Sequence, residues 1–172
     1  MSGRKPVDPL ADATPLIRRV YGYVAFRMGG GPDAEDVTGE VFERAVRYRD
    51  TFDPEKGTAT AWLLGIAHRC VDDAFRRRAA RPTGSADERG QGTENEALDR
   101  IAFQRALAEL AQRDRDLLAL RYGVGLSTKQ IAQALDLKPG TVDVAIHRAR
   151  ARLAAALGRE DEPLDAATSA GG

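Results

Sequence analysis

The segment from Gly125 to Leu157 places polar and basic residues at spacings that suit DNA recognition. Ser127 and Gln130 are three residues apart, the spacing of a capping box, which starts a helix by satisfying free backbone N–H groups. The turn 136–140 ends that helix, and Pro139 suits the first position of a second helix. Two helices joined by a tight turn predict a helix-turn-helix, the motif that puts a helix in the DNA major groove.

The second helix of this motif divides into an apolar face and a polar face. Apolar residues recur at steps of three and four, which predicts a buried stripe: Val142, Ile146, Ala149, Leu153 and Leu157. The outward face carries Thr141, Asp143, Val144, His147, Arg148, Arg150 and Arg152. These types can contact base edges and phosphates, which favours DNA binding. An ordinary antiparallel helix pair with solvated arginines is the alternative interpretation.

Charge is segregated along the chain although its total is balanced. The 172 residues include 26 basic and 26 acidic ones. The charged residues of 33–43 are all acidic, residues 69–81 carry five arginines, and the stretch after Arg159 is acidic again. This pattern is typical of a protein with one acidic protein-binding face and separate basic surfaces.

The elements that position these residues are helices throughout. Periodic apolar residues predict helices over 14–28, 33–48, 60–80, from Thr93 onward, and over 113–122. Gly, Pro, Ser and charged residues replace this periodicity before Thr93, which indicates a flexible linker. The expected fold class is all-α, with two small helical domains, the second a four-helix unit that ends in the helix-turn-helix. The expected boundaries are 14–80 and 93–158 for the domains, 81–92 for the linker, and 1–13 and 159–172 for disordered tails.

Several classes of protein are disfavoured by the sequence. Cys70 is the only cysteine, so an internal disulfide is excluded and a reducing compartment fits. We find no apolar run of membrane-spanning length and no signal-peptide core, so we expect a cytoplasmic protein without membrane insertion. His68 and Cys70 are two apart on a helix and face away from each other, which argues against a metal site. Because no catalytic constellation is present, we expect no enzyme activity, no cofactor and no small-molecule substrate.

Three motifs in order resemble a known family. They are DAEDVTGEVFERA at 33–45, AWLLGIAHRCVDDAFRRR at 61–78, and ALAELAQRDRDLLALRYGVGLSTKQIAQALDLKPGTVDVAIHRARARL at 106–153. The match is to bacterial RNA polymerase sigma factors of the extracytoplasmic-function (ECF) group, and it covers about Leu16 to Leu157. The resemblance implies a promoter-specificity subunit, with region 2 at 14–80 and region 4 at 93–158. It also implies three partners: core RNA polymerase, promoter DNA and an anti-sigma factor.

The resemblance assigns roles to residues in the first domain. The core polymerase-binding residues are Asp36, Glu40, Phe42 and Glu43. The residues that bind and open the minus-ten element are Tyr48, Arg49, Phe52, Lys56, Trp62, Arg69, Arg76 and Arg77. Trp62 has an alternative place in the core, since it is spaced by four from Ile66. The arginines at 76–78 have an alternative role at the helix C-terminus.

The minus-thirty-five residues are assigned in the same way, with one departure from the family. They are Lys138, Thr141, Asp143, Val144, His147 and Arg148. The family has basic and polar residues just after Gly-Thr-Val, where this chain has Asp143 and Val144. Asp143 could accept a hydrogen bond from cytosine N4, or it could repel phosphate and weaken binding. The alternative function is therefore a sigma-like regulatory protein that acts mainly through protein–protein interaction, with weak DNA binding by its second domain.

Overall fold

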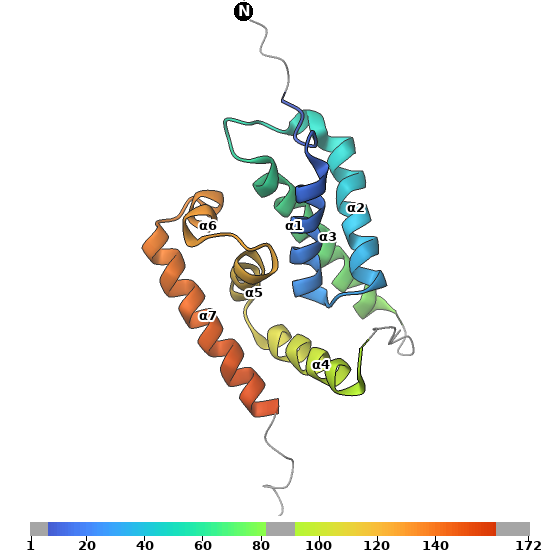
Figure 1. Ribbon diagram of the computed structural model, residues 1–172, viewed down its shortest axis with the longest axis vertical. Coiled ribbons are helices and arrows are strands. Elements are labelled where there is room, and N and C mark those ends of the chain that lie inside the picture. Colours follow the sequence, from blue (N-terminus) through green and yellow to red (C-terminus); the bar gives the residue numbers. More distant parts are fainter. Residues whose placement is uncertain (1–6, 82–91, 161–172) are drawn as a thin grey trace, which may run out of the picture.

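The computed structural model describes residues 7–81 and 92–160, and within them it confirms the all-α fold class (Figure 1). Residues 1–6, 82–91 and 161–172 lie outside the described residues, and with them most of the predicted linker and large parts of both predicted tails. Residues 159 and 160, predicted as tail, still belong to the last helix.

Three helices form the N-terminal half. They are α1 (Ala13–Met28), α2 (Pro32–Tyr48) and α3 (Ala59–Ala80), and the short 3-10 turn η1 (Arg49–Thr51) follows α2. Thr58 caps α3 by accepting a hydrogen bond from the backbone N–H of Ala61 at 3.2 Å. α1 begins at Ala13, one residue before the predicted start at residue 14, and Asp12 precedes the helix without a side-chain capping bond.

The C-terminal half contains α4 (Glu94–Glu109), α5 (Gln112–Leu118), the π-helical turn η2 (Ala119–Gly123), α6 (Thr128–Leu135) and α7 (Pro139–Glu160). The predicted capping box of Ser127 with Gln130 is present, and a second capping box, of Thr93 with Glu96, starts α4. The turn between α6 and α7 is made by Asp136, whose φ of 54° and ψ of 48° are left-handed. Asp tolerates this conformation better than most residues do. The helix-turn-helix therefore forms as predicted, with Pro139 at the start of α7.

Four apolar residues that the periodicity places on helix faces are exposed. They are Ile17, Leu98, Ile101 and Leu135, between 37% and 58% exposed. On α4 only Ala106 and Leu107 are buried, because α7 and α1 cover the C-terminal part of that helix. Periodicity identifies an apolar face, but its burial depends on which element lies against it.

One buried core runs through both halves. Val20, Tyr23 and Val24 of α1 belong to the same buried cluster as Leu117 and Leu120 of the C-terminal half. α1 lies between α2 and α3 on one side and η2 on the other (Figure 1). A second, smaller cluster joins α4, α5 and α7. The apolar periodicity gave no sign that the two helical units touch.

Candidate functional site

The predicted polymerase-binding residues lie on α2, and their surroundings differ. Asp36 and Glu43 are exposed, whereas Phe42 is partly buried against the core. The Glu40 side chain is 26% exposed and is held in ion pairs with two arginines. Asp36 and Glu43 are therefore the exposed carboxylates of this set, which a basic partner can reach directly.

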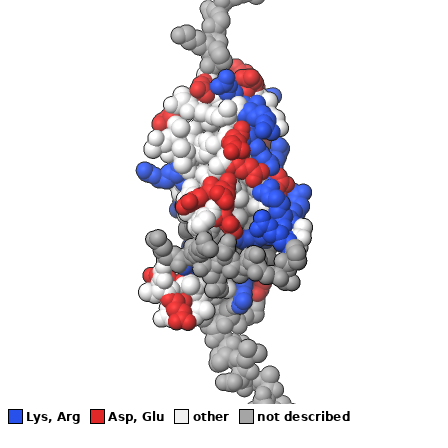
Figure 2. Space-filling view, turned by 90° about the vertical axis from the view of Figure 1, so that its right-hand side faces the viewer, with Lys and Arg blue, Asp and Glu red and all other residues white. Residues whose placement is uncertain are grey.

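A strip of ion pairs joins α2 to α3. Arg44 donates to Glu40 at 2.5 Å and to Asp73 of α3 at 2.9 Å, and Arg77 donates to Glu40 at 2.9 Å. The hydrogen bond from Arg44 holds the pKa of Asp73 below its usual range. In return, Asp73 raises the pKa of the Arg44 guanidinium above its usual value. Figure 2 shows acidic and basic side chains side by side on this face of the molecule.

The arginines at the end of α3 are engaged with acidic side chains. Arg77 is bonded to Glu40, Arg76 lies 3.1 Å from Asp73, and Arg78 donates to Asp33 at 2.5 Å. All three remain between 49% and 75% exposed. Their first role in the structure is to tie α3 to itself and to α2, so a DNA phosphate would have to replace or share these carboxylates.

The aromatic residues predicted to act at the minus-ten element surround the loop after α2. Tyr48 is 50% exposed. The rings of Phe52 and Trp62 lie 5.6 Å apart between centroids and are tilted by 58°. Trp62 is partly buried against the core, which favours a role in packing the loop over a role as an open stacking surface. Tyr48 is the most accessible ring of the three.

Three further cations predicted for this region are exposed. Arg49 follows α2, Lys56 lies in the loop before α3, and Arg69 lies on α3 itself. The Lys56 side chain is 85% exposed and stands 3.5 Å from Asp53. These cations can approach a phosphate without breaking a buried contact.

The polar face of α7 is open to solvent over its first two turns. Thr141, Val144 and Arg148 line one open groove of about 560 Å³. Lys138 is exposed just before the helix. The structure thus brings four of the six predicted minus-thirty-five residues to one accessible end and face of α7.

Arg113 is a residue of this groove that the sequence did not single out. It precedes Asp114 on α5 and lines the groove with Thr141 and Arg148. Arg152 lines it too, held at 2.6 Å by the mostly buried Asp114. Arg113 lies on another helix, twelve residues before Gly125, so it gives no motif signal, and only the packing of α5 against α7 reveals it.

Asp143 has a structural partner within the motif. Its carboxylate accepts a hydrogen bond from the Thr128 hydroxyl at 2.7 Å. Thr128 is the first residue of α6, so this bond joins the two helices of the motif and places a negative charge near the positive end of α6. Asp143 thus braces the helix-turn-helix, which is a role the sequence did not predict.

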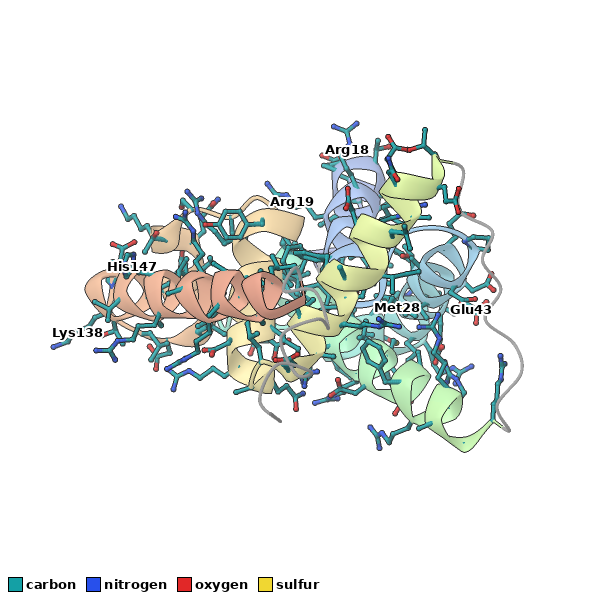
Figure 3. All side chains as sticks on the ribbon, turned by 90° about the horizontal axis from the view of Figure 1, so that it is seen from below. Arg18, Arg19, Met28, Glu43, Lys138 and His147 are labelled. Carbon is teal, nitrogen blue, oxygen red and sulfur yellow. The ribbon has the colours of Figure 1, made fainter. Side chains whose placement is uncertain are left out.

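His147 does not share the groove of Arg148. It lines a second, apolar groove of about 610 Å³, together with Phe26, Phe103 and Tyr122. Figure 3 shows His147 and Lys138 on α7, on the far side of the molecule from Glu43 of α2. The candidate DNA-reading residues and the candidate polymerase-binding residues therefore lie on different sides of the molecule.

Within the described residues, no three His, Cys, Asp or Glu side chains converge as a metal-binding group. No helix in those ranges has the length and apolar character to cross a bilayer. Cys70 is fully buried, and burial raises the pKa of its thiol to about 11.

A cluster of polar side chains between the two halves was not predicted from the sequence. Arg27, only 3% exposed, pairs with Asp116 of α5 and lies 3.5 Å from Asp72 of α3. The buried Tyr23 hydroxyl donates to Asp116 at 2.8 Å and lies 3.2 Å from His68 Nδ1. Burial and the nearby Asp116 raise the pKa of Tyr23 far above its usual value. The i, i+4 spacing of Tyr23 and Arg27 was the available signal, because it puts both on one face of α1.

Comparison with known proteins identifies the family. Residues 14–81 match the Sigma-70 region 2 family and residues 100–153 match the Sigma-70 region 4 family. The ECF RNA polymerase sigma factor SigL of Mycobacterium tuberculosis is 34% identical over 76% of this chain and 77% of its own. The chain belongs to the ECF sigma factors.

Other relatives agree with this assignment. The ECF sigma factor SigF of Caulobacter vibrioides is 32% identical over 83% of this chain and 82% of its own length. BldN of Streptomyces coelicolor is 33% identical, and this chain spans 54% of it. As a member of this family, the chain is a promoter-specificity subunit of RNA polymerase, so the function predicted from the sequence is confirmed.

Solved structures are similar as well. CnrH, solved in complex with the cytosolic domain of CnrY, matches with a TM-score of 0.56 and 26% identity over 87% of this chain and 84% of CnrH. RpoE of Bartonella quintana, solved with the anti-sigma factor NepR, has the same fold, with a TM-score of 0.57 and 22% identity over 86% of this chain and 94% of RpoE.

Proposed function

We propose that this ECF sigma factor binds core polymerase through α2 and reads promoter DNA with the loop before α3 and the polar face of α7. The supporting observation is that exposed carboxylates on α2 and an exposed basic face on α7 occupy separate surfaces of one chain. Asp36 and Glu43 supply the charge for a basic polymerase surface, and Phe42 supplies apolar area beside them.

The minus-ten contacts involve melted DNA. Holding a base out of the stack costs a few kcal/mol, which stacking and pocket contacts must offset. Tyr48 is the exposed ring best placed for this role. Arg49, Lys56 and Arg69 hold phosphates of the displaced strand, and Arg76 and Arg77 add to them at the end of α3.

At the minus-thirty-five element, α7 enters the major groove. Thr141 and Val144 approach the base edges, while Arg148 and Lys138 contact phosphates. Arg113 adds a phosphate contact from α5, since it lines the same groove. His147 contributes from the adjacent side of the helix.

A regulatory partner completes the proposal. CnrH was solved with the cytosolic domain of CnrY, and we infer that this chain is likewise held by an anti-sigma protein. The protein acts in the cytoplasm, and it performs no catalysis of its own.

The alternative function is a protein-interaction role with weak DNA binding. The reason for it was the negative charge of Asp143, which could repel phosphate. The bond between Asp143 and Thr128 supplies a structural reason for that carboxylate, so its presence no longer counts strongly against DNA binding. The exposed groove with Arg113 and Arg148 favours the promoter-reading role.

Run-off transcription with purified core polymerase tests the proposal. We expect promoter-specific transcripts only when this protein is added, and fewer transcripts when Arg148 and Arg113 are changed to Ala together. A stable complex with core that gives no specific transcript would favour the interaction role. If no complex with core forms, the proposed function is wrong.

A further inference from the structure

Val144 is an apolar residue on the exposed face of α7 that belongs to neither buried cluster of the described chain. Its side chain is 49% exposed, and at 3.6 residues per turn it lies roughly opposite the buried Val142, Ile146 and Ala149. A β-branched side chain loses χ1 freedom in a helix, so valine is a poorer helix former than alanine. Because core packing does not offset this cost at an exposed position, the fold of the free chain gives no reason for valine there.

Gly140, one helical turn before Val144, is also not required by the fold. Its φ is not positive, and a Cβ atom there would meet nothing within 4 Å. Neither backbone conformation nor packing therefore excludes a side chain at this position. Residues four apart lie on the same face of a helix, and a glycine lets a ligand approach the helix backbone closely. Both positions are explained if a ligand lies against this face.

The surface around Val144 offers methyl groups more than hydrogen-bonding groups. The carboxylate of Asp143 accepts a hydrogen bond from the Thr128 hydroxyl at 2.7 Å, and His147 lines the separate apolar groove. The residues of the first turns of α7 that share a groove with Val144 are Gly140, Thr141, Ala145 and Arg148. Of these, the short side chains carry one hydroxyl, on Thr141, and otherwise methyl groups only.

Cations line the same groove. Arg148 follows Val144 by one helical turn, and Arg113 reaches the groove from α5. Arg152 lines it too and is held at 2.6 Å by Asp114. Guanidinium groups suit phosphate oxygens. The groove thus combines groups that bind a polyanion with an apolar surface, which fits a base that carries a methyl group.

We propose that α7 selects thymine in the minus-thirty-five element, with Val144 and the Thr141 methyl group against the C5-methyl groups of neighbouring thymines. This inference rests on the proposed function and adds the base that the helix prefers. Thymine alone among the four bases presents a methyl group in the major groove, whereas guanine and adenine are read by arginine, asparagine or glutamine. Burial of one methyl group changes affinity by about fourfold.

A promoter pool randomised around minus thirty-five gives the first readout. Holoenzyme is formed from core polymerase and the full chain, and the promoters that it retains are sequenced. We expect thymine to be enriched at adjacent positions on one strand. Retained promoters without any preference for A·T pairs in this element would overturn the inference. If the holoenzyme retains no promoter at all, the proposed function is wrong and the inference falls with it.

Replacement of thymine by deoxyuridine in the selected element gives the second readout. Deoxyuridine keeps the base pair and lacks only the C5-methyl group, so it separates methyl contact from the effects of DNA shape. In gel-shift titrations, the wild-type holoenzyme should bind about fourfold more weakly for each contacted thymine that is replaced. The same replacement in the spacer between the two elements should have no effect. Equal binding to both DNAs would overturn the inference, whereas the proposed function would stand because promoter-specific binding persists.

Val144→Ala tests which residue contacts the methyl group. Alanine favours the helix, so circular dichroism should show unchanged helix content. The variant should bind the thymine promoter about fourfold more weakly than wild type and should distinguish thymine from deoxyuridine by less than about 1.5-fold. Val7→Ala is the matched control, because Val7 is 59% exposed and precedes α1; it should behave as wild type on both DNAs. If Val144→Ala loses as much affinity on deoxyuridine as wild type does, the assignment to Val144 is wrong.

Discussion

At the residue scale, Asp143 stands where a DNA-reading helix ordinarily carries a basic or polar side chain. Its carboxylate is occupied by the Thr128 hydroxyl, and it lies near the N-terminus of α6, where a negative charge is favourable. The carboxylate therefore stabilises the motif while adding a negative charge to the face that approaches phosphate. These two effects can be separated by substitution.

Asp143→Asn keeps an oxygen that accepts the Thr128 hydrogen bond and removes the charge. We expect the full chain to bind promoter duplex about two- to fivefold more tightly near 0.1 M salt, because one repulsion with phosphate is lost. Fluorescence anisotropy across a salt series measures the change.

Thr128→Val is the control for that substitution. It removes the bridge and keeps the charge, so it should lower the free energy of unfolding by about 1 kcal/mol and leave DNA binding no tighter. Weaker binding by Asp143→Asn would mean that Asp143 reads a base.

Cys70 provides a second residue-scale prediction. Its thiol is buried and its pKa is raised to about 11, so at pH 8 almost no reactive thiolate is present. We expect a disulfide reagent such as DTNB to leave the folded chain unmodified over minutes and to react at once in denaturing urea. Rapid reaction of the folded chain would contradict the described burial.

At the element scale, Arg44 links α2 to α3 through Glu40 and Asp73. Because the pKa of Asp73 is lowered in the folded chain, its contribution to stability is present above the unfolded value near pH 4 and is lost as the pH falls through the depressed value. Solvent screening keeps such pairs to about 0.5–1 kcal/mol.

Arg44→Met should therefore lower the free energy of unfolding by about 1 kcal/mol at pH 7. The difference from wild type should narrow as the pH falls below about 4. Urea unfolding at several pH values measures both effects, and Arg44→Lys, which keeps the charge, should lose less. A difference that is constant down to pH 3 would show that Asp73 is not part of the linkage.

The helices themselves were largely predictable from the sequence. Helix starts depend on local hydrogen bonds and allowed φ values, as in the capping boxes at Thr93 and Ser127 and at Pro139. These features can be identified from neighbouring residues in the sequence alone. α1 starts one residue before the predicted start, because Thr14-Pro15 has the residue types of a cap and a first helical position although the chain is already helical at Ala13.

Contacts between elements were not predictable from local patterns. Thr128 and Asp143 are fifteen residues apart and meet only because α6 crosses α7. A glycine such as Gly22 is expected to weaken a helix. Only the structure shows that a Cβ atom at this position would collide with the backbone carbonyl of Gly123. Arg27, read alone, is a cation at a helix end, whereas the structure buries it against Asp116. The candidate site residues were found from family motifs, but their partners required the fold.

At the scale of the whole molecule, the polymerase-binding and DNA-reading surfaces are carried by different helices. The double substitution Asp36→Lys and Glu43→Lys reverses exposed charges on α2 while sparing the ion-paired Glu40. We expect about tenfold weaker binding to core polymerase, with little change in melting temperature, because no buried contact is removed. Gel-shift titration with core measures the loss.

Asp99→Lys on α4 is the control for the α2 variant, since Asp99 is exposed on another helix. It should bind core as wild type does. Equal weakening by both variants would indicate a general charge effect in place of a defined α2 surface.

Permanganate footprinting of promoter DNA tests the central claim most directly, because it reports polymerase recruitment and strand opening together. With core polymerase and this chain both present, thymines around the minus-ten element should become reactive; with either protein alone they should stay protected in duplex. Reactive thymines with core alone, or none with both proteins on any promoter that supports specific binding, would contradict the account.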